Sequence, residues 1–133
     1  MAQILVDRAT IFIVDNDAAV RDALTTLFAD LDVFVRTYPD AEAFLRELRQ
    51  QVHGCLIVEL DLPGMNGLEL MNKLRAMAIE IPTIILASDS NVPLAVRAMR
   101  AGAIDFIDKP FIEHTLLARV RQTLRLPRTD TSY

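Results

Sequence analysis

Short apolar segments alternate with longer segments of helical periodicity along the whole chain, and this alternation limits the fold more than any other feature. Residues 10–14 read TIFIV, an unbroken apolar run that predicts a strand buried on both faces. Residues 18–31 then place apolar side chains three or four positions apart, which predicts a helix. The pair of patterns occurs five times. The predicted strands are residues 10–14, 33–36, 55–58, 83–87 and 103–107. Three of the predicted helices are residues 18–31, 92–102 and 111–126. The other two are a helix that opens at Tyr38-Pro39-Asp40 and a helix that is capped by Asn66.

Strict alternation of strands and helices predicts an α/β fold of the doubly wound type. Right-handed crossovers between the strands give a five-stranded parallel sheet with helices on both faces. A chain of 133 residues suits one domain with one core. We therefore expect a single domain over residues 1–133, with its core at about 10–125 and a mobile tail at about 127–133.

The composition excludes several classes of protein. Hydrophobic residues make up 52% of the chain and charged residues 24%, which indicates a globular protein. A net charge of −4 argues against binding to a nucleic-acid backbone. No apolar run is long enough to span a membrane. The one cysteine, Cys55, lies in the most apolar predicted strand, so we expect it to be buried and reduced, which fits a cytoplasmic protein.

Polar side chains gather where the predicted strands end, and the carboxyl ends of parallel strands form one edge of the sheet. These residues are Asp15, Asn16, Asp17, Glu59, Asp61, Ser88, Asp89, Asp108 and Lys109. Acids from two strands with a lysine from a third predict a site for Mg²⁺ and a phosphoryl group. The carboxylates would hold the cation, and the lysine would contact the phosphoryl oxygens.

The segments IFIVDND, LPGMNGLEL, IPTIILAS and VPLAVRAMRAGAIDFIDKPF, with their spacing, resemble the receiver domain of two-component response regulators. The resemblance covers residues 10 to 125, and AGAIDFIDKPF is its most specific part. It implies a flavodoxin-like (βα)5 fold, a bacterial phosphorelay and a signalling role that is not enzymatic. Details of the motifs resemble regulators with a DNA-binding output domain. No such domain follows in this sequence, so we expect a stand-alone receiver.

The resemblance also assigns roles to individual positions. In the family, an Asp at the end of the third strand accepts the phosphoryl group, and here that position is Glu59. The two acids that bind Mg²⁺ correspond to Asp15 and Asn16. The hydroxyl that senses the phosphoryl group corresponds to Ala87. The switching aromatic residue and the pocket lysine match at Phe106 and Lys109.

Three of these positions depart from the family pattern. Glu59 extends its carboxylate by about 1.5 Å, and a displacement of that size costs phosphoryl transfer about a hundredfold. Asn16 removes a charge from the cation site, although Asp17 could compensate in part. Ala87 lacks the sensing hydroxyl, and Ser88 replaces it only if the strand has already ended.

These departures predict that ordinary phosphorylation is lost and that the chain acts by binding other proteins. We expect no resident cofactor, and only weak Mg²⁺ binding through Asp15, Asn16 and Glu59.

Two alternatives remain open. One is a working phosphoacceptor that uses Asp61 or Glu59. The other is a phosphatase of the haloacid dehalogenase type with Asp15 as the nucleophile and Asp17 as the acid, although Ala19 stands where that motif has Thr or Val. Nucleotide binding through a Gly-x-Gly-x-x-Gly or a Gly-Lys-Ser/Thr loop is not expected, because neither loop is present.

The expected partner is a sensor histidine kinase or another signalling protein, with no nucleic acid and no membrane. In the resembled family, the fourth helix, fifth strand and fifth helix often form a homodimer face. This region carries Arg97 and Arg100 beside Asp105 and Glu113, a mixture of charges that suits a two-fold contact. A monomer with scattered surface charges is an equal expectation.

Overall fold

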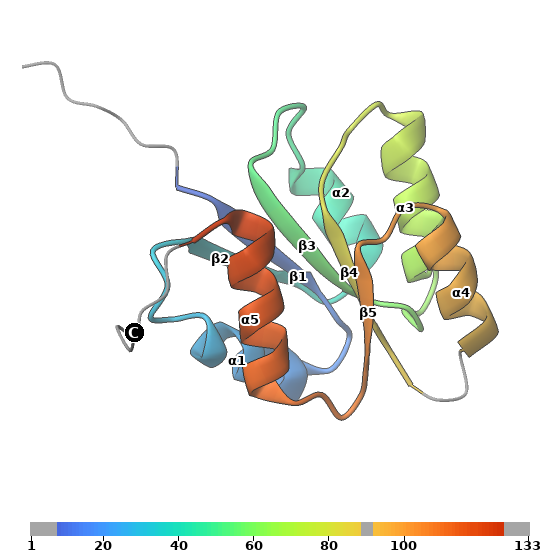
Figure 1. Ribbon diagram of the computed structural model, residues 1–133. Coiled ribbons are helices and arrows are strands. Elements are labelled where there is room, and N and C mark those ends of the chain that lie inside the picture. The colour runs from blue at the N-terminus through green and yellow to red at the C-terminus, as the bar shows by residue number, and fades with distance from the viewer. Residues whose placement is uncertain (1–7, 89–91, 127–133) are drawn as a thin grey trace, which may run out of the picture.

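A parallel sheet of five strands runs through the centre of the molecule in the order β2-β1-β3-β4-β5 (Figure 1). The computed structural model describes residues 8–88 and 92–126. Asp89 and the predicted tail lie outside the described residues. The strands are β1 Thr10–Val14, β2 Phe34–Tyr38, β3 Gly54–Glu59, β4 Thr83–Ala87 and β5 Asp105–Asp108. The predicted doubly wound α/β architecture is confirmed.

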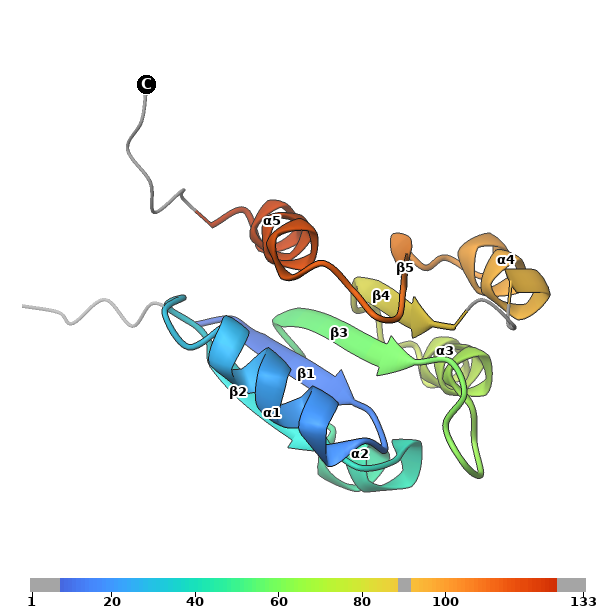
Figure 2. The ribbon, with the colours of Figure 1, turned by 90° about the horizontal axis from the view of Figure 1, so that it is seen from below.

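Five helices cover both faces of the sheet. They are α1 Ala18–Leu27, α2 Ala41–Glu47, α3 Gly67–Ala76, α4 Val92–Arg100 and α5 Glu113–Leu124. Buried side chains of α1 and α5 pack on one face of the sheet, and those of α2, α3 and α4 pack on the other. Figure 2 looks along the layers and shows α5 and α2 on opposite sides of the strands. The sheet therefore has an apolar core on each face.

The central position of β3 explains why its sequence is so apolar. Residues 55–58 are fully buried, because helices cover both of their faces. Cys55 is among them, which confirms that it is a core residue. Burial raises the pKa of its thiol to about 12. The thiol therefore stays protonated at neutral pH and serves as a small apolar side chain.

Polar side chains fix where three helices begin. Asp17 accepts a hydrogen bond from the backbone N–H of Ala19 at 2.9 Å, at the start of α1. Asp40 accepts one from Ala43 N–H at 2.7 Å, at the start of α2. The predicted cap at Asn66 is confirmed, and with Glu69 it forms a reciprocal capping box. These caps satisfy N–H groups that a helix leaves unpaired in its first turn.

Several predicted boundaries are wrong by a few residues. The first helix ends at Leu27, four residues early, although Leu31 is still buried and so continues the apolar pattern. Tyr38 belongs to the second strand, because β2 pairs with β1 as far as Tyr38 and Val14. The last strand starts at Asp105 rather than residue 103, because its pairing with β4 begins there. The last helix spans Glu113–Leu124, shorter at each end than 111–126.

Candidate functional site

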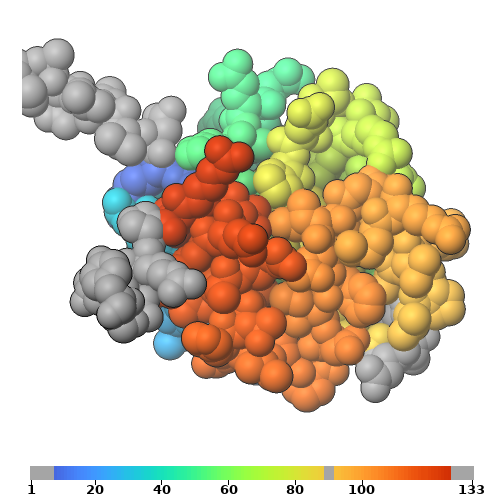
Figure 3. Space-filling view, in the orientation of Figure 1, coloured from blue at the N-terminus to red at the C-terminus, as the bar shows by residue number. Residues whose placement is uncertain are grey.

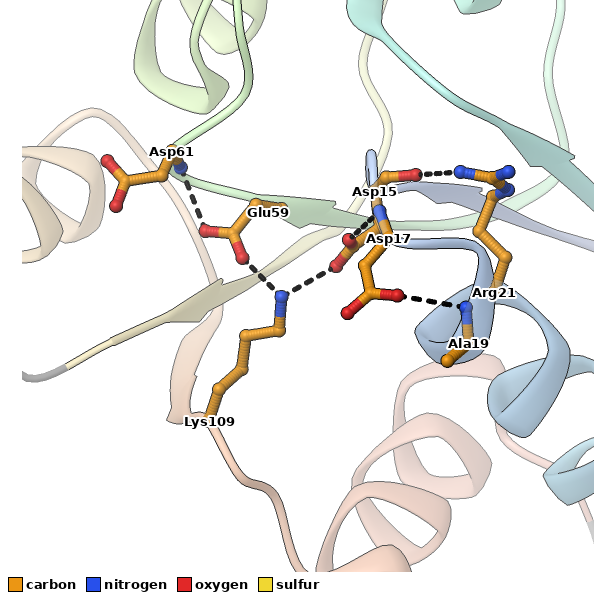
Figure 4. A network of polar contacts seen from close by, with 7 residues as sticks. All are labelled: Asp15, Asp17, Ala19, Arg21, Glu59, Asp61 and Lys109. Atoms are coloured by element: carbon orange, nitrogen blue, oxygen red, sulfur yellow. Dashed lines mark hydrogen bonds and ion pairs between the residues drawn. The ribbon is translucent and has the colours of Figure 1, made fainter.

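The carboxyl edge of the sheet brings together three of the predicted site residues. Asp15 follows the last residue of β1, Glu59 is the last residue of β3, and Lys109 follows the last residue of β5. Both acids are buried, with Asp15 fully inaccessible and Glu59 5% exposed. Three segments that lie far apart in the sequence therefore deliver two carboxylates and one ammonium group to one place (Figure 4).

The ammonium group of Lys109 joins the two carboxylates. Its Nζ donates to Oδ2 of Asp15 at 3.0 Å and also donates to Oε1 of Glu59 (Figure 4). The other oxygen of each carboxylate accepts from the backbone, Asp15 from Asp17 N–H at 2.9 Å and Glu59 from Asp61 N–H at 2.8 Å. All four carboxylate oxygens thus have partners within the protein, which is what burial of charge requires.

The same contacts set the direction of the pKa of Lys109. Burial lowers this pKa, whereas the hydrogen bonds to Glu59 and Asp15 raise it by more, so that it lies above its ordinary value of 10.5. The side chain is 21% exposed. Lys109 is therefore a permanent cation in a site that is largely shielded from solvent.

The other residues predicted for the acidic pocket are Asn16, Asp17 and Asp61, which lie around this cluster. Asp17 is occupied as the cap of α1, and Asn16 is exposed. Asp61 is exposed, and Figure 4 shows its carboxylate pointing away from Lys109. The sequence reading missed Arg21, whose guanidinium donates to the backbone oxygen of Asp15 at 2.6 Å. No sequence signal identifies it, because its partner is a main-chain atom.

The predicted switch positions lie on β4 and β5 beside the cluster. Ala87 ends β4, is 1% exposed and has no hydrogen-bonding group on its side chain. Ser88 directly follows the strand and is half-buried. Phe106 is half-buried on β5, where it pairs with Ile85 and packs against the core beneath α3 and α4.

The donor set fits Mg²⁺ poorly. A hard divalent cation seeks several oxygen ligands, preferably charged ones. Here the two buried carboxylates already share an ammonium group, Asp17 caps a helix, and Asn16 is neutral. Within residues 8–88 and 92–126, no three His, Cys, Asp or Glu side chains converge to hold a metal ion.

The four charged residues predicted for a dimer face come from α4, β5 and α5. Figure 3 shows the segments from α4 to α5 side by side on the visible face. Arg97, Arg100 and Glu113 are exposed there. Asp105 differs, because its Oδ2 accepts from Nε of Arg119 on α5 at 2.9 Å. Arg119 itself is half-buried and paired within the chain.

Comparison with known proteins agrees with this geometry. Residues 11–121 match the model of the response regulator receiver domain family. Response regulator protein TmoT of Ectopseudomonas mendocina is 41% identical over 118 residues, covering 89% of this chain and 54% of that protein. Transcriptional regulatory protein FixJ of Bradyrhizobium diazoefficiens is 37% identical over 115 residues, covering 86% and 56%. The chain spans about half the length of these curated relatives.

Solved structures give the same result. A response regulator receiver protein from Pseudoalteromonas atlantica superposes with a TM-score of 0.80 at 41% identity, covering 87% of this chain and 97% of that one. The response regulator StyR superposes with a TM-score of 0.83 at 40% identity, covering 90% and 61%.

The chain belongs to the response regulator receiver domain family and is a receiver of two-component signal transduction. Receiver domains are signalling modules that interact with sensor kinases, and they are not typical enzymes. This assignment removes the main reason to read Asp15 as a phosphatase nucleophile, and the burial of Asp15 beneath Lys109 agrees. Among the helices in the described part of the chain, none has the length and apolar character needed to cross a bilayer.

Proposed function

We propose that this receiver has lost ordinary phosphorylation at position 59 and transmits its signal by binding other proteins in a fixed conformation. The observation that carries the proposal is the closed contact between Glu59, Lys109 and Asp15. A reactive carboxylate must present a free oxygen to the phosphorus atom in line with the leaving group. Both oxygens of Glu59 are instead occupied, one by an ammonium group and one by a backbone N–H.

Two further features support the same proposal. The poor donor set for Mg²⁺ leaves little to offset the charge of an incoming phosphoryl group. The methyl group of Ala87 could not hydrogen-bond a phosphoryl oxygen if one were attached. Both the chemistry at Glu59 and its readout at Ala87 would therefore be impaired.

Intact-mass measurement after incubation with acetyl phosphate and 20 mM Mg²⁺ tests this proposal. We expect no stoichiometric phosphoryl adduct on the unmodified chain. Glu59→Asp shortens the side chain and frees the carboxylate from Lys109, so we expect it to gain at least tenfold more adduct. Glu59→Gln is the matched control, because it keeps the length of the side chain and removes the nucleophile.

A hydroxylamine-labile adduct on the unmodified chain would overturn the proposal. Its loss in Glu59→Gln would identify Glu59 as the acceptor, and its loss in Asp61→Asn would identify Asp61. The direction of the Asp61 carboxylate, away from Lys109, argues against the second outcome (Figure 4). Hydrolysis of a generic phosphomonoester by the chain would support the phosphatase alternative instead.

The partner surface that we favour is the face formed by α4, β5 and α5. Val92, Val96 and Met99 are each 38–46% exposed, and their spacing places them on one side of α4. Ile104, 40% exposed, precedes β5 on the same face. Exposed apolar side chains with charged neighbours are typical of protein-binding sites.

Analytical ultracentrifugation can test whether the partner on this face is a second copy of the chain. If it is, Val96→Glu should shift the equilibrium to the monomer at least tenfold, and Met77→Glu, at a similarly exposed position just after α3, should leave it unchanged. A monomer at all concentrations would exclude the homodimer and leave a different protein, such as a kinase, as the partner.

A further inference from the structure

The face of the sheet beneath α2 is only partly covered. Side chains of β1 and β2 that point to this face include Phe12 and Tyr38, and both pack edge-on against Phe44 of α2, with ring centroids 5.5 and 5.4 Å apart. α2 has seven residues and ends at Glu47, and the chain is extended at Leu48. The helix therefore covers the carboxyl half of these two strands and stops short of their amino half.

A hollow of about 950 Å³ lies at this place. The hollow is lined by side chains of β1 and of β2 along its length, and by the end of α2 and the segment that leads to β3. The volume is at the upper end of the range for small-molecule sites. Sequence periodicity gave no indication of it, because the hollow arises from the mismatch between a short helix and longer strands.

The hollow is strongly basic although the chain is acidic. Arg8, Arg36, Arg46 and Arg49 line it, and among the described residues Glu47 is the one acid in its lining. The carboxylate of Glu47 already accepts the hydroxyl of Tyr38 at 3.0 Å. Since the chain carries a net charge of −4, this concentration of positive charge is local.

Three of these cations have no anionic partner among residues 8–88 and 92–126. Arg8 pairs with Asp32 at 2.9 Å. The guanidinium groups of Arg36, Arg46 and Arg49 form no ion pair and no hydrogen bond with any residue in the described part of the chain. Planar guanidinium groups can bind a phosphate or carboxylate through two parallel hydrogen bonds. The hollow thus presents anion-binding groups that are not used elsewhere.

An aromatic ring lies beside these cations. Phe34 on β2 is 46% exposed, and the guanidinium of Arg8 lies 4.7 Å from the centre of its ring. An exposed phenylalanine that already stacks with a cation can also accept a flat ring from a ligand. A free inorganic anion would make no use of this surface.

We propose that the hollow between α2 and the amino half of β1 and β2 binds a small organic phosphate that carries an aromatic ring. The phosphate would bind Arg36, Arg46 and Arg49, and the ring would stack at Phe34. The volume suits a ligand the size of a nucleoside monophosphate. The glycine-rich nucleotide loops that the sequence lacks bind phosphate through backbone N–H groups, so their absence does not bear on a site made of arginine side chains.

Isotope-edited NMR titration of the 133-residue chain tests the proposal with adenosine monophosphate as the probe. We expect shift changes confined to residues of the hollow, with affinity at least tenfold higher than for inorganic phosphate or for adenosine alone. Arg36→Gln and Arg49→Gln should each weaken binding about tenfold, and so should Phe34→Ser. Arg97→Gln, an equally exposed change on α4, is the matched control and should have no effect.

Four results would overturn the proposal. These are the absence of shifts at millimolar probe, equal binding of inorganic phosphate and the nucleotide, equal loss of binding in Arg97→Gln, and binding of an acidic peptide as tight as that of the nucleotide. The last would make the hollow a protein-binding surface. This proposal can fail or succeed whatever the phosphodonor experiment shows, because the hollow and the Glu59 site share no residue.

Discussion

Opposite ends of the sheet carry opposite charge, and the protein treats the two charges differently. At the carboxyl end, Asp15 and Glu59 are buried and share the ammonium of Lys109. In the hollow beside β1 and β2, Arg36 and Arg49 are exposed and form no ion pair or hydrogen bond with any described residue. The first set of charges is paired within the fold, and the second set is exposed to solvent.

The difference follows from the cost of desolvation. A charge that loses its water must gain a partner of comparable strength, and Lys109 is that partner for both acids. An exposed arginine keeps its water and needs no partner for the chain to fold. The buried set should therefore control stability, and the exposed set should control what can bind.

The largest effect that we predict concerns the backbone at the amino end. Gly54, the first residue of β3, has a φ of +148°, and a Cβ at this position would overlap the backbone oxygen of Thr10. We expect Gly54→Ala to lower the free energy of unfolding by about 4 kcal/mol or more, because neither backbone can move without breaking the sheet. Urea denaturation followed by circular dichroism measures this loss.

Gly102→Ala is the control for that experiment. Gly102 also has a positive φ, of +114°, but the nearest atom to a new Cβ would be the end of the Arg75 side chain at 3.9 Å. Its cost should be limited to backbone strain of about 1–2 kcal/mol. If the two variants lose equal free energy of unfolding, backbone strain alone would explain both losses. The overlap of the new Cβ with Thr10 at the amino end of the sheet would then add nothing.

Removal of the buried cation should have the next largest effect. Lys109→Met leaves Asp15 and Glu59 buried side by side without a counter-charge, and we expect a loss of about 3 kcal/mol in the free energy of unfolding at pH 7. Lys73→Met, an exposed change on α3, should cost less than about 0.5 kcal/mol. A loss below 1 kcal/mol in Lys109→Met would mean that the cluster is better hydrated than its burial indicates.

Much of the fold and part of the site can be predicted from the sequence for the same physical reason. A strand covered on both faces must be apolar throughout, so residues 55–58 reveal both their structure and their depth. Parallel strands bring their carboxyl ends to one edge, so the meeting of Asp15, Glu59 and Lys109 follows from topology.

The remaining features depend on contacts that leave no periodic signal. Asp17 was expected near the cation site, but a hydrogen bond to Ala19 makes it a helix cap. Asp105 is predicted at an interface, and its pairing with Arg119 of α5 could not be foreseen from the sequence. The basic hollow depends on where α2 ends, and its arginines come from β2, from α2 and from the segments that precede β1 and follow α2. Such features require distances between segments, which sequence spacing does not give.

Alkaline pH should lower the free energy of unfolding by an intermediate amount, because it ionises the thiol of Cys55, which is buried and uncharged in the folded chain. Burial raises the pKa of Cys55 to about 12 from an ordinary 9.0, so the unfolded chain loses the thiol proton first. The stabilising effect is complete below pH 9 and is lost as pH rises toward 12. Between pH 8 and 10 we expect Cys55 to account for a fall of about 1 kcal/mol in the free energy of unfolding.

The variant Cys55→Ala isolates this contribution to the pH dependence. Its stability at pH 8 should be lower than that of the unmodified chain because of lost packing, but its decline between pH 8 and 10 should be shallower by about 1 kcal/mol. The raised pKa of Lys109 acts at higher pH and is common to both proteins. Identical slopes would show that the thiol ionises as readily in the folded chain as in the unfolded one.

The smallest predicted effect is the most direct test of the contrast between the two ends of the sheet. Arg36→Gln and Arg49→Gln remove exposed cations that have no ion-pair partner in the described part of the chain, so each should change the free energy of unfolding by less than about 0.5 kcal/mol. Arg119→Gln, which breaks the partly exposed pair with Asp105, should cost up to about 1 kcal/mol. Thermal denaturation at low and high salt measures all three variants. A loss above 1 kcal/mol in either of the first two would mean that the fold uses these arginines. They would then no longer be free to hold a ligand. Unchanged stability together with weakened binding of adenosine monophosphate would instead show that these arginines serve ligand binding and not folding.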